Sequence, residues 1–146
     1  MSERTALAQL IEQLKASGFE GDIESSYAER VVAATDNSIY QLIPQAILYP
    51  RSEQDIVLTA STVYRLLDQG FSLCARGGGT GTNGQSLSDS LILDCSRYLN
   101  QITGFDRENL SIVVQPGVVL DQLNEFLKPY GLFFPIDISS SSRATL

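Results

Sequence analysis

Five of the chain's eleven glycines lie within the nine residues 76–84, in the run Arg-Gly-Gly-Gly-Thr-Gly-Thr-Asn-Gly. The apolar segment 71–76 is typical of a β-strand, so these glycines form a loop at a strand's carboxyl end. Glycine has no Cβ and tolerates positive φ, so successive N–H groups of such a loop can converge on one anion. Thr80, Thr82 and Asn83 add side-chain donors. The run predicts a phosphate-binding loop, and a tight turn without a ligand is the alternative.

Three kinds of phosphate-binding loop match parts of this run. Gly79, Gly81 and Gly84 fit the G-x-G-x-x-G dinucleotide fingerprint, but that fingerprint needs a helix after its third glycine. Only the six residues 85–90 precede the next apolar segment, which is too short for such a helix. A nucleotide triphosphatase loop needs a lysine where Gln85 stands. The sequence therefore favours a loop between two strands that wraps a pyrophosphate with backbone amides.

The apolar segments predict an α/β or α+β fold around a small sheet. Residues 46–49 and 71–76 are two strands separated by a helical pattern, and a strand-helix-strand unit makes its strands parallel. Further strands are predicted at 91–95, 101–105 and 111–115. Residues 106–109 have the composition of a hairpin turn between the last two strands. The strand order does not follow from the sequence.

Helical spacing of apolar residues predicts four helices. The first runs from Leu7 to a glycine cap at Gly18, and the fourth covers residues 120–130. Ser26 and Ser52 open the second and third helices, each with an acidic residue three positions later, as in a capping box. The apolar face predicted for the third helix consists of Ile56, Ala60, Val63 and Leu67.

The composition of the chain excludes several classes of function. With 10 basic and 17 acidic residues the net charge is −7, which repels nucleic acid and anionic lipid, so that local geometry must hold any phosphate. No apolar run reaches the roughly 20 residues that span a bilayer, and no signal-like leader begins the chain, so we expect a cytoplasmic protein. Cys74 and Cys95 are expected to be buried thiols, because a metal site would need histidines and the chain has none.

The strand, the Arg-Gly-Gly-Gly-Thr-Gly loop and the later Pro-Gly pair at 116–117 resemble the FAD-linked oxidases related to vanillyl-alcohol oxidase, over about residues 44–146. Within that family the sequence is similar to the bacterial D-2-hydroxyglutarate dehydrogenases that carry a carboxyl-terminal iron–sulfur domain. The segments 35–41, 76–85 and 143–146 carry this similarity. The resemblance implies the amino-terminal part of a PCMH-type FAD-binding domain, with any iron–sulfur cluster in a later part of a parent protein.

The resemblance also assigns roles to positions. Residues 77–82 would wrap the FAD pyrophosphate, residues 116–117 would line the nucleotide side, and residues 135–145 would lie along the ribityl chain and flavin ring. The cofactor-binding set that it implies is Arg76, Gly77, Gly78, Gly79, Thr80, Gly81, Thr82, Asn83, Gly84, Pro116, Gly117, Asp137, Ser140, Ser142 and Thr145. Covalent family members bond the flavin through a histidine at the position of Thr80. Because the chain has no histidine, FAD is expected to be noncovalent.

By resemblance, the parent protein is an FAD-dependent dehydrogenase of a 2-hydroxy acid, of the D-2-hydroxyglutarate or the D-lactate and glycolate type. A hydride would pass from the substrate C2 to the flavin N5, and the electrons would leave to a separate acceptor. No residue here is a convincing general acid or base, so no catalytic residue is predicted. For the chain itself, a nonenzymatic nucleotide-binding or phosphate-binding module and an inactive structural fragment are the alternatives.

The predicted organisation is a helical lead-in over residues 1–43 and the first part of the FAD-binding domain over residues 44–146. The last residues, 144–146, carry no capping or turn signal, which suggests a domain interrupted at its carboxyl end. Apolar surface that the rest of the domain would cover is expected to cause self-association into a homo-oligomer. The expected partners are FAD and, for the parent protein, a small 2-hydroxy acid.

Overall fold

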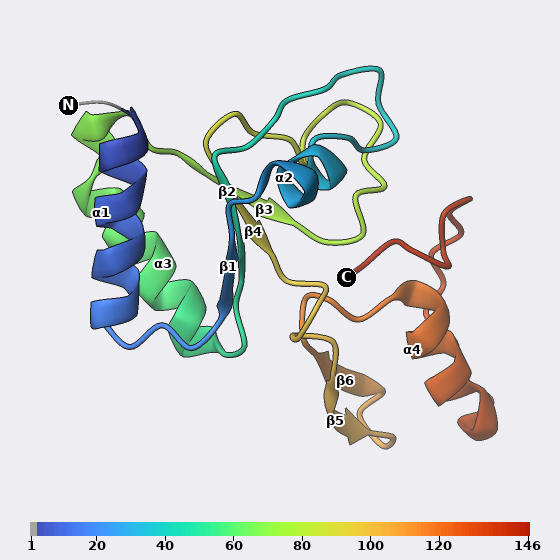
Figure 1. Ribbon diagram of the computed structural model, residues 1–146. Coiled ribbons are helices and arrows are strands. Elements are labelled where there is room, and N and C mark those ends of the chain that lie inside the picture. The colour runs from blue at the N-terminus through green and yellow to red at the C-terminus, as the bar shows by residue number, and fades with distance from the viewer. Residues whose placement is uncertain (1–2) are drawn as a thin grey trace.

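A computed structural model describes residues 3–146 as two lobes, a four-stranded sheet with three α-helices and a two-stranded hairpin with one (Figure 1). The mixed α/β fold predicted from the sequence is confirmed. The elements in chain order are α1 (Glu3–Ala16), β1 (Asp22–Glu24), α2 (Tyr27–Ala33), β2 (Ala46–Tyr49), α3 (Glu53–Arg65), η1 (Leu67–Gln69), β3 (Leu73–Arg76), β4 (Leu91–Asp94), β5 (Ile102–Asp106), β6 (Ser111–Val114), α4 (Leu120–Leu127) and η2 (Lys128–Tyr130).

The larger sheet has the strand order β1-β2-β4-β3. The strands β2 and β3 both run parallel to β4, which lies between them, so the parallel direction predicted for the strand-helix-strand unit is confirmed. Strand β1 pairs antiparallel with β2 at the edge. The sequence did not predict β1, because the three residues Asp-Ile-Glu form no apolar run and only Ile23 packs against the core.

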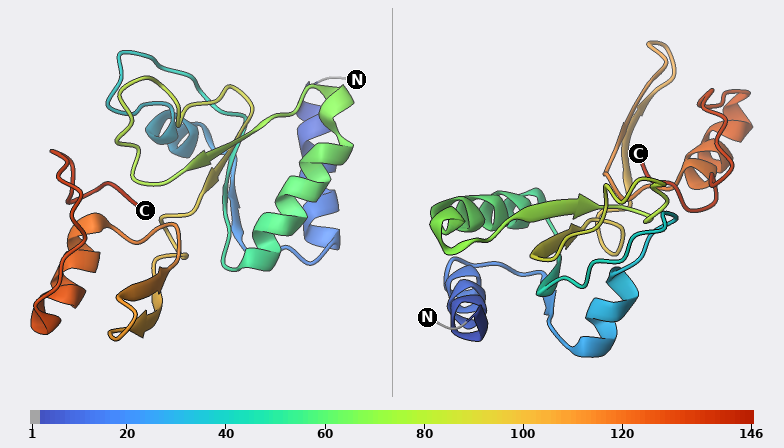
Figure 2. Two further views of the ribbon diagram at one scale, coloured as in Figure 1. Left: turned by 180° about the vertical axis from the view of Figure 1, so that it is seen from behind. Right: turned by 90° about the horizontal axis from the view of Figure 1, so that it is seen from above.

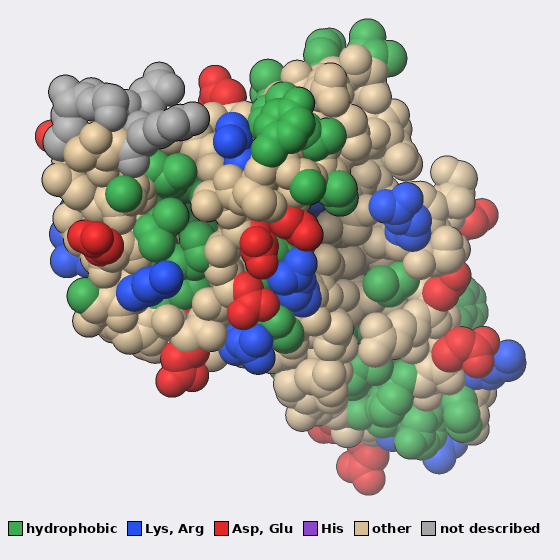
Figure 3. All heavy atoms as spheres, viewed as in Figure 1, with side chains coloured by type: hydrophobic (Ala, Val, Ile, Leu, Met, Phe, Trp, Pro, Cys, Tyr) green, Lys and Arg blue, Asp and Glu red, His purple; other side chains and the backbone are tan. Residues whose placement is uncertain are grey.

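The hairpin β5–β6 and helix α4 form the second lobe, which stands away from the larger sheet in both views of Figure 2. The predicted hairpin turn is confirmed, and Asp106 stabilises it by accepting hydrogen bonds from the backbone N–H groups of Glu108 and Asn109, each at 3.0 Å. Val118, Leu123 and Leu127 form this lobe's buried core. Further hydrophobic side chains gather on its surface at the lower right of Figure 3.

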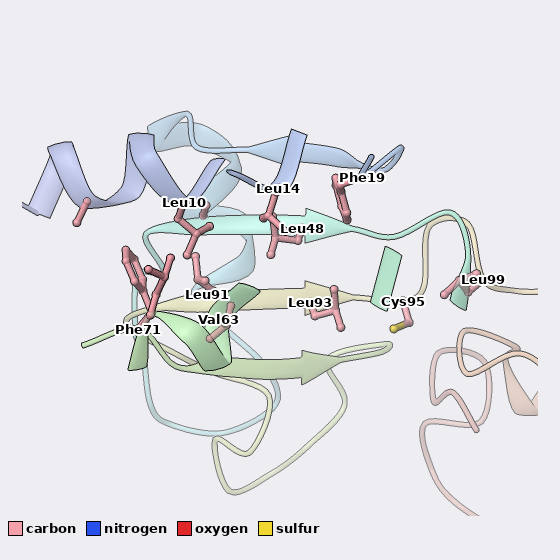
Figure 4. Packing of buried hydrophobic residues seen from close by; sticks show 13 residues of the cluster. Leu10, Leu14, Phe19, Leu48, Val63, Phe71, Leu91, Leu93, Cys95 and Leu99 are labelled. Carbon is pink, nitrogen blue, oxygen red and sulfur yellow. The ribbon is translucent and has the colours of Figure 1, made fainter. Parts of the chain in front are cut away.

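The main core lies between helices α1 and α3 and one face of the larger sheet (Figure 4). Leu10 and Leu14 of α1, Leu48 of β2 and Leu91 of β4 have 0% exposed surface. The neighbouring residue Ile47 faces the opposite side, where α2 covers it. With both faces covered, the two central strands are continuous apolar runs, as is usual for parallel strands. Because α1 and β1 pack here, the residues before position 44 share a core with those after it.

The face that helix α3 buries matches only part of the one that its apolar residues predict. Ile56 and Val63 pack against the main core, but Ala60 is exposed and Leu67 is 52% exposed. Thr59 and Thr62 are buried instead, at 0% and 1% exposure. The Thr59 hydroxyl donates to the carbonyl oxygen of Asp55 at 2.8 Å, so its burial leaves no unpaired polar group. The spacing of apolar residues alone does not predict that these threonines are buried.

Among residues 3–146, no helix combines the length and the hydropathy needed to cross a membrane.

Candidate functional site

A cavity of about 350 Å³ lies at the carboxyl ends of the three parallel strands. Tyr49, Arg76 and Asp94 are the last residues of β2, β3 and β4, and all three line it. Open α/β sheets bind ligands at this edge. Both lobes contribute walls. The complete lining is Val32, Ala33, Tyr49, Arg76, Gly77, Gly78, Asp94, Ser96, Val119, Ser142 and Arg143.

The first two glycines of the loop pack directly against the chain's last residues. A Cβ on Gly77 would overlap the Thr145 hydroxyl, and a Cβ on Gly78 would overlap the carbonyl oxygen of Arg143. The tail itself is held on the second lobe, because Leu120 N–H donates to the carbonyl oxygen of Ala144 at 3.0 Å. Glycine is therefore required at positions 77 and 78 for the loop and the tail to meet around the cavity.

The rest of the glycine loop turns away from the cavity. Gly79 and Gly84 adopt positive φ angles of 62° and 74°, which side chains rarely tolerate. The Gln85 side chain closes the loop by accepting a hydrogen bond from Asn83 N–H at 3.0 Å. Thr82 and Asn83 are exposed and absent from the cavity wall. The structure thus brings only the near end of the loop to the cavity.

Arg76 holds the base of the loop. Its Nη2 donates to the carbonyl oxygen of Thr35 at 2.8 Å, and its Nη1 lies 3.4 Å from the carbonyl oxygens of Ala33 and Ser86. Its Nε lies 4.0 Å from an Asp94 carboxylate oxygen, and both side chains are largely buried. These contacts occupy the guanidinium, so Arg76 orders the cavity wall.

The tail adds a second arginine to the cavity. Arg143 is exposed, and it takes part in none of the ion pairs found within residues 3–146. Its guanidinium is therefore available to an anion beside Gly77 and Gly78. Asp94 lines the same cavity and accepts hydrogen bonds from the Ser96 N–H at 2.9 Å and from the Ser96 hydroxyl at 2.6 Å. The cavity thus combines an available cation and backbone amides with a carboxylate acceptor.

The other residues predicted for the site lie elsewhere. Gly117 is buried, donates its N–H to the carbonyl oxygen of Leu99 at 2.7 Å and has no room for a Cβ beside the carbonyl oxygen of Cys95. Tight packing thus accounts for this glycine. Pro116 and Asp137 are exposed and do not line the cavity.

In the tail, the Ser140 carbonyl accepts hydrogen bonds within the turn at 140–144, so Ser140 shapes the turn that delivers Ser142 and Arg143.

Several residues that line the cavity were not predicted from the sequence, among them Tyr49, Asp94, Ser96 and Arg143. Tyr49 and Asp94 end strands parallel to the one that precedes the glycine loop, so the rule that ligands bind at this edge could have found them. Val32 and Ala33 come from α2, and no pattern in the sequence placed that helix at the cavity.

A polar cluster beside Tyr49 ties β1 to the segment after β4. Asp22 accepts a hydrogen bond from the Tyr98 hydroxyl and one from Arg51 Nη2 at 3.2 Å, and Arg97 pairs with it at 3.5 Å. Arg97 also stacks over the ring of Tyr49, 3.4 Å from its centroid. The hydrogen bond from Tyr98, followed by the one from Arg51, lowers the pKa of Asp22.

From this cluster we predict a lowered pKa for Asp22, which NMR can measure. The pKa of Asp22 is depressed in the folded chain, so the cluster's contribution to stability is present at neutral pH and is lost as the pH falls through that lowered pKa, below the ordinary aspartate value of about 3.9. Replacing Tyr98 with phenylalanine should raise the pKa of Asp22, as followed through its carboxyl ¹³C shift. An unchanged titration in Tyr98→Phe would contradict the assignment.

Comparison with known proteins finds a family that matches most of the chain. The FAD binding domain family matches residues 44–146. D-2-hydroxyglutarate dehydrogenase of Pantoea ananatis is 50% identical over 136 residues, which are 93% of this chain and 13% of that protein. The Escherichia coli protein of the same name is 43% identical over 150 residues, 100% of this chain and 15% of its own length. The chain thus spans about one seventh of these relatives.

A solved structure of alkyldihydroxyacetonephosphate synthase superposes with a TM-score of 0.80 at 18% identity, over 94% of this chain and 28% of that one. At this identity the likeness shows a shared fold.

Proposed function

Because the chain belongs to the FAD-binding domain family, we propose that it holds the pyrophosphate of FAD for a flavin-dependent oxidoreductase. The observation that carries the proposal is the meeting of Gly77 and Gly78 with Arg143 at the carboxyl ends of three parallel strands. Backbone N–H groups in a glycine loop bind phosphate oxygens, and a guanidinium adds a paired charge. The local arrangement offsets the chain's net charge of −7, which otherwise repels such a ligand.

The residues present fit this cofactor. Gly77 and Gly78 would face the pyrophosphate with Arg143, while Asp94 offers an acceptor to a hydroxyl group of the nucleotide. Ser142 also lines the cavity, and Thr145 lies beside Gly77. The remaining residues that the family resemblance implies stay proposals, with Gly79, Thr80, Gly81, Thr82, Asn83 and Gly84 completing the loop and Pro116, Gly117, Asp137 and Ser140 contributing to the shape of its surroundings.

We propose that residues 44–146 form the first part of the FAD-binding domain and that residues 1–43 form a helical lead-in packed against it. The longer proteins that this chain resembles bear the name D-2-hydroxyglutarate dehydrogenase, which supports a 2-hydroxy acid as the substrate of the corresponding whole protein. Bound FAD supplies the acceptor for a hydride. The chain's part in that reaction is to bind and orient the cofactor.

Titration of FAD into the chain, followed by flavin fluorescence, tests the proposed function. We expect saturable binding, and we expect acid precipitation of the complex to leave all the flavin in the supernatant. The flavin should be released because the chain has no histidine to bond it, and burial raises the pKa of both cysteine thiols, which disfavours the reactive thiolate. Flavin that stays with the precipitated protein would contradict noncovalent binding.

ADP in the same titration separates the flavin proposal from a general nucleotide module. A cofactor domain should bind FAD more tightly than ADP, because FAD makes every contact of ADP and adds those of its flavin half. Equal affinity for the two ligands would favour the nonenzymatic nucleotide module.

We also propose that the chain self-associates. Leu110, Val113 and Phe133 on the second lobe are 71%, 62% and 71% exposed. An apolar patch of this kind favours association. Sedimentation velocity should show a sedimentation coefficient that rises with protein concentration, and replacing Phe133 with serine should reduce the rise. A monomer at every concentration would contradict the proposal.

A further inference from the structure

The connector between α2 and β2 forms a closed loop beside the glycine loop. Its ends are joined by a hydrogen bond from Leu42 N–H to the carbonyl oxygen of Ala34 at 3.1 Å and by a bridge between Thr35 and Gln41. In Figures 1 and 2 this teal segment runs next to the yellow-green segment that follows β3. We call residues 34–42 the connector.

Asp36 links the connector to the end of the glycine loop. Its Oδ2 accepts a hydrogen bond from the Ser86 hydroxyl at 3.1 Å, and its Oδ1 accepts one from Ser38 N–H at 2.8 Å. Asp36 is half-buried and Ser86 is 8% exposed. Burial opposes ionisation of this carboxyl, but the hydrogen bonds from Ser38 and Ser86 outweigh that effect and lower its pKa.

Two other contacts join the same segments. Arg76 Nη2 donates to the carbonyl oxygen of Thr35 in the connector, while its Nη1 reaches the carbonyl oxygen of Ser86. The ring of Tyr40 covers Gly84, where a Cβ would come within 3.1 Å of it. Arg76 begins the loop and Ser86 ends it, so the connector fixes both ends.

We propose that Asp36 is a positioning residue for FAD, which through Ser86 holds the glycine loop in the conformation that presents Gly77 and Gly78 to the cavity. This inference rests on the proposed function of the cavity. Asp36 itself is not part of the cavity lining, so it acts through the loop. A loop held before binding loses less conformational entropy when its ligand arrives, and its affinity is correspondingly higher.

Substitutions at the two ends of the link test the proposal in the 146-residue chain. Asp36→Ala should weaken FAD binding by about tenfold, which corresponds to about 1.4 kcal/mol. Ser86→Ala should have a similar effect, and the double variant should be no weaker than either single one, because all three lack the same link. Asp36→Asn should restore most of the affinity, since its amide oxygen can accept from Ser38 N–H and its NH₂ group can donate to the Ser86 hydroxyl.

Asp89→Ala is the matched control, because it removes an exposed carboxylate three residues from Ser86 that does not line the cavity. Its affinity for FAD should equal that of the unaltered chain. Equal losses in Asp36→Ala and Asp89→Ala would overturn the proposal, since the loss would then not depend on the link to Ser86. Additive losses in the double variant would overturn it as well.

Amide hydrogen exchange without FAD distinguishes failure of this inference from failure of the proposed function. Asp36→Ala and Ser86→Ala should both accelerate exchange across residues 77–85 and leave β2 and β4 protected. If the unaltered chain bound no FAD, the proposed function of the chain would fail while these rates still decided whether Asp36 holds the loop. Unchanged rates at residues 77–85 in Asp36→Ala would overturn the inference whatever the affinity.

Discussion

Replacing Gly78 with alanine should weaken FAD binding strongly and leave the sheet folded. The new Cβ would overlap the carbonyl oxygen of Arg143, which is backbone and cannot rotate away. The tail must therefore move off the glycine loop, and the cavity loses the wall formed by Ser142 and Arg143. Loss of the paired charge and of the enclosed geometry should weaken binding by at least about 100-fold, or about 2.7 kcal/mol. Fluorescence titration measures this change.

Gly104→Ala is the control for this substitution. A Cβ at Gly104 would meet only Val113 at 3.6 Å, which is ordinary van der Waals contact, and its φ is not positive. Gly104 lies in β5, away from the cavity lining. Its affinity for FAD should be unchanged. If Gly78→Ala bound FAD as well as Gly104→Ala, the contact between the loop and the tail would not shape the binding site.

Replacing Asp55 with alanine should destabilise the chain by more than the loss of a helix cap does. Asp55 is 1% exposed, and its carboxylate accepts hydrogen bonds from the backbone N–H groups of Glu20 at 2.9 Å and Arg51 at 2.8 Å. Alanine would leave both donors without this acceptor, at about 1–3 kcal/mol each. We expect the free energy of unfolding in urea to fall by about 2–6 kcal/mol, with an unchanged dependence on urea concentration.

Two further variants set a scale for this loss of stability. Asp55→Asn keeps one acceptor oxygen and should lose less than the alanine variant. Ser52→Ala removes only the hydroxyl that accepts from Asp55 N–H at 3.1 Å, the cap of α3, and should cost about 1 kcal/mol. A loss in Asp55→Ala no larger than that in Ser52→Ala would mean that the two backbone donors are satisfied in another way.

Local sequence patterns predicted those parts of the fold in which a single residue type determines the local backbone, such as the first residue of a helix. Ser26 and Ser52 cap helices α2 and α3 by accepting hydrogen bonds from Glu29 N–H and Asp55 N–H, as their spacing predicts. The second half of the capping motif of α3 differs, because the Asp55 carboxylate turns to Glu20 and Arg51 and thereby joins α3 to the segment before β1. Glu20 lies 35 residues away from Asp55, and local spacing carries no information about it.

The candidate site, too, was predicted from the sequence only in part. The glycine density predicted a loop for phosphate, and its first glycines do line the cavity. The walls from Tyr49, Asp94 and Ser96 depend on the strand order, which the sequence left open. Composition alone could not distinguish a glycine that faces a ligand from one such as Gly117, which is required by the packing of its own backbone against Cys95 and Leu99.

The position of the cavity's walls along the chain has a consequence for biosynthesis. Gly78 and Arg143 face the same cavity but leave the ribosome roughly 65 residues apart. At 5–20 residues per second, the glycine loop waits roughly 3 to 13 seconds for its opposite wall. During that interval the sheet can fold from its own strands, whereas the cavity still lacks the wall that the tail provides. If the cavity holds FAD as proposed, its capture cannot precede the synthesis of the tail.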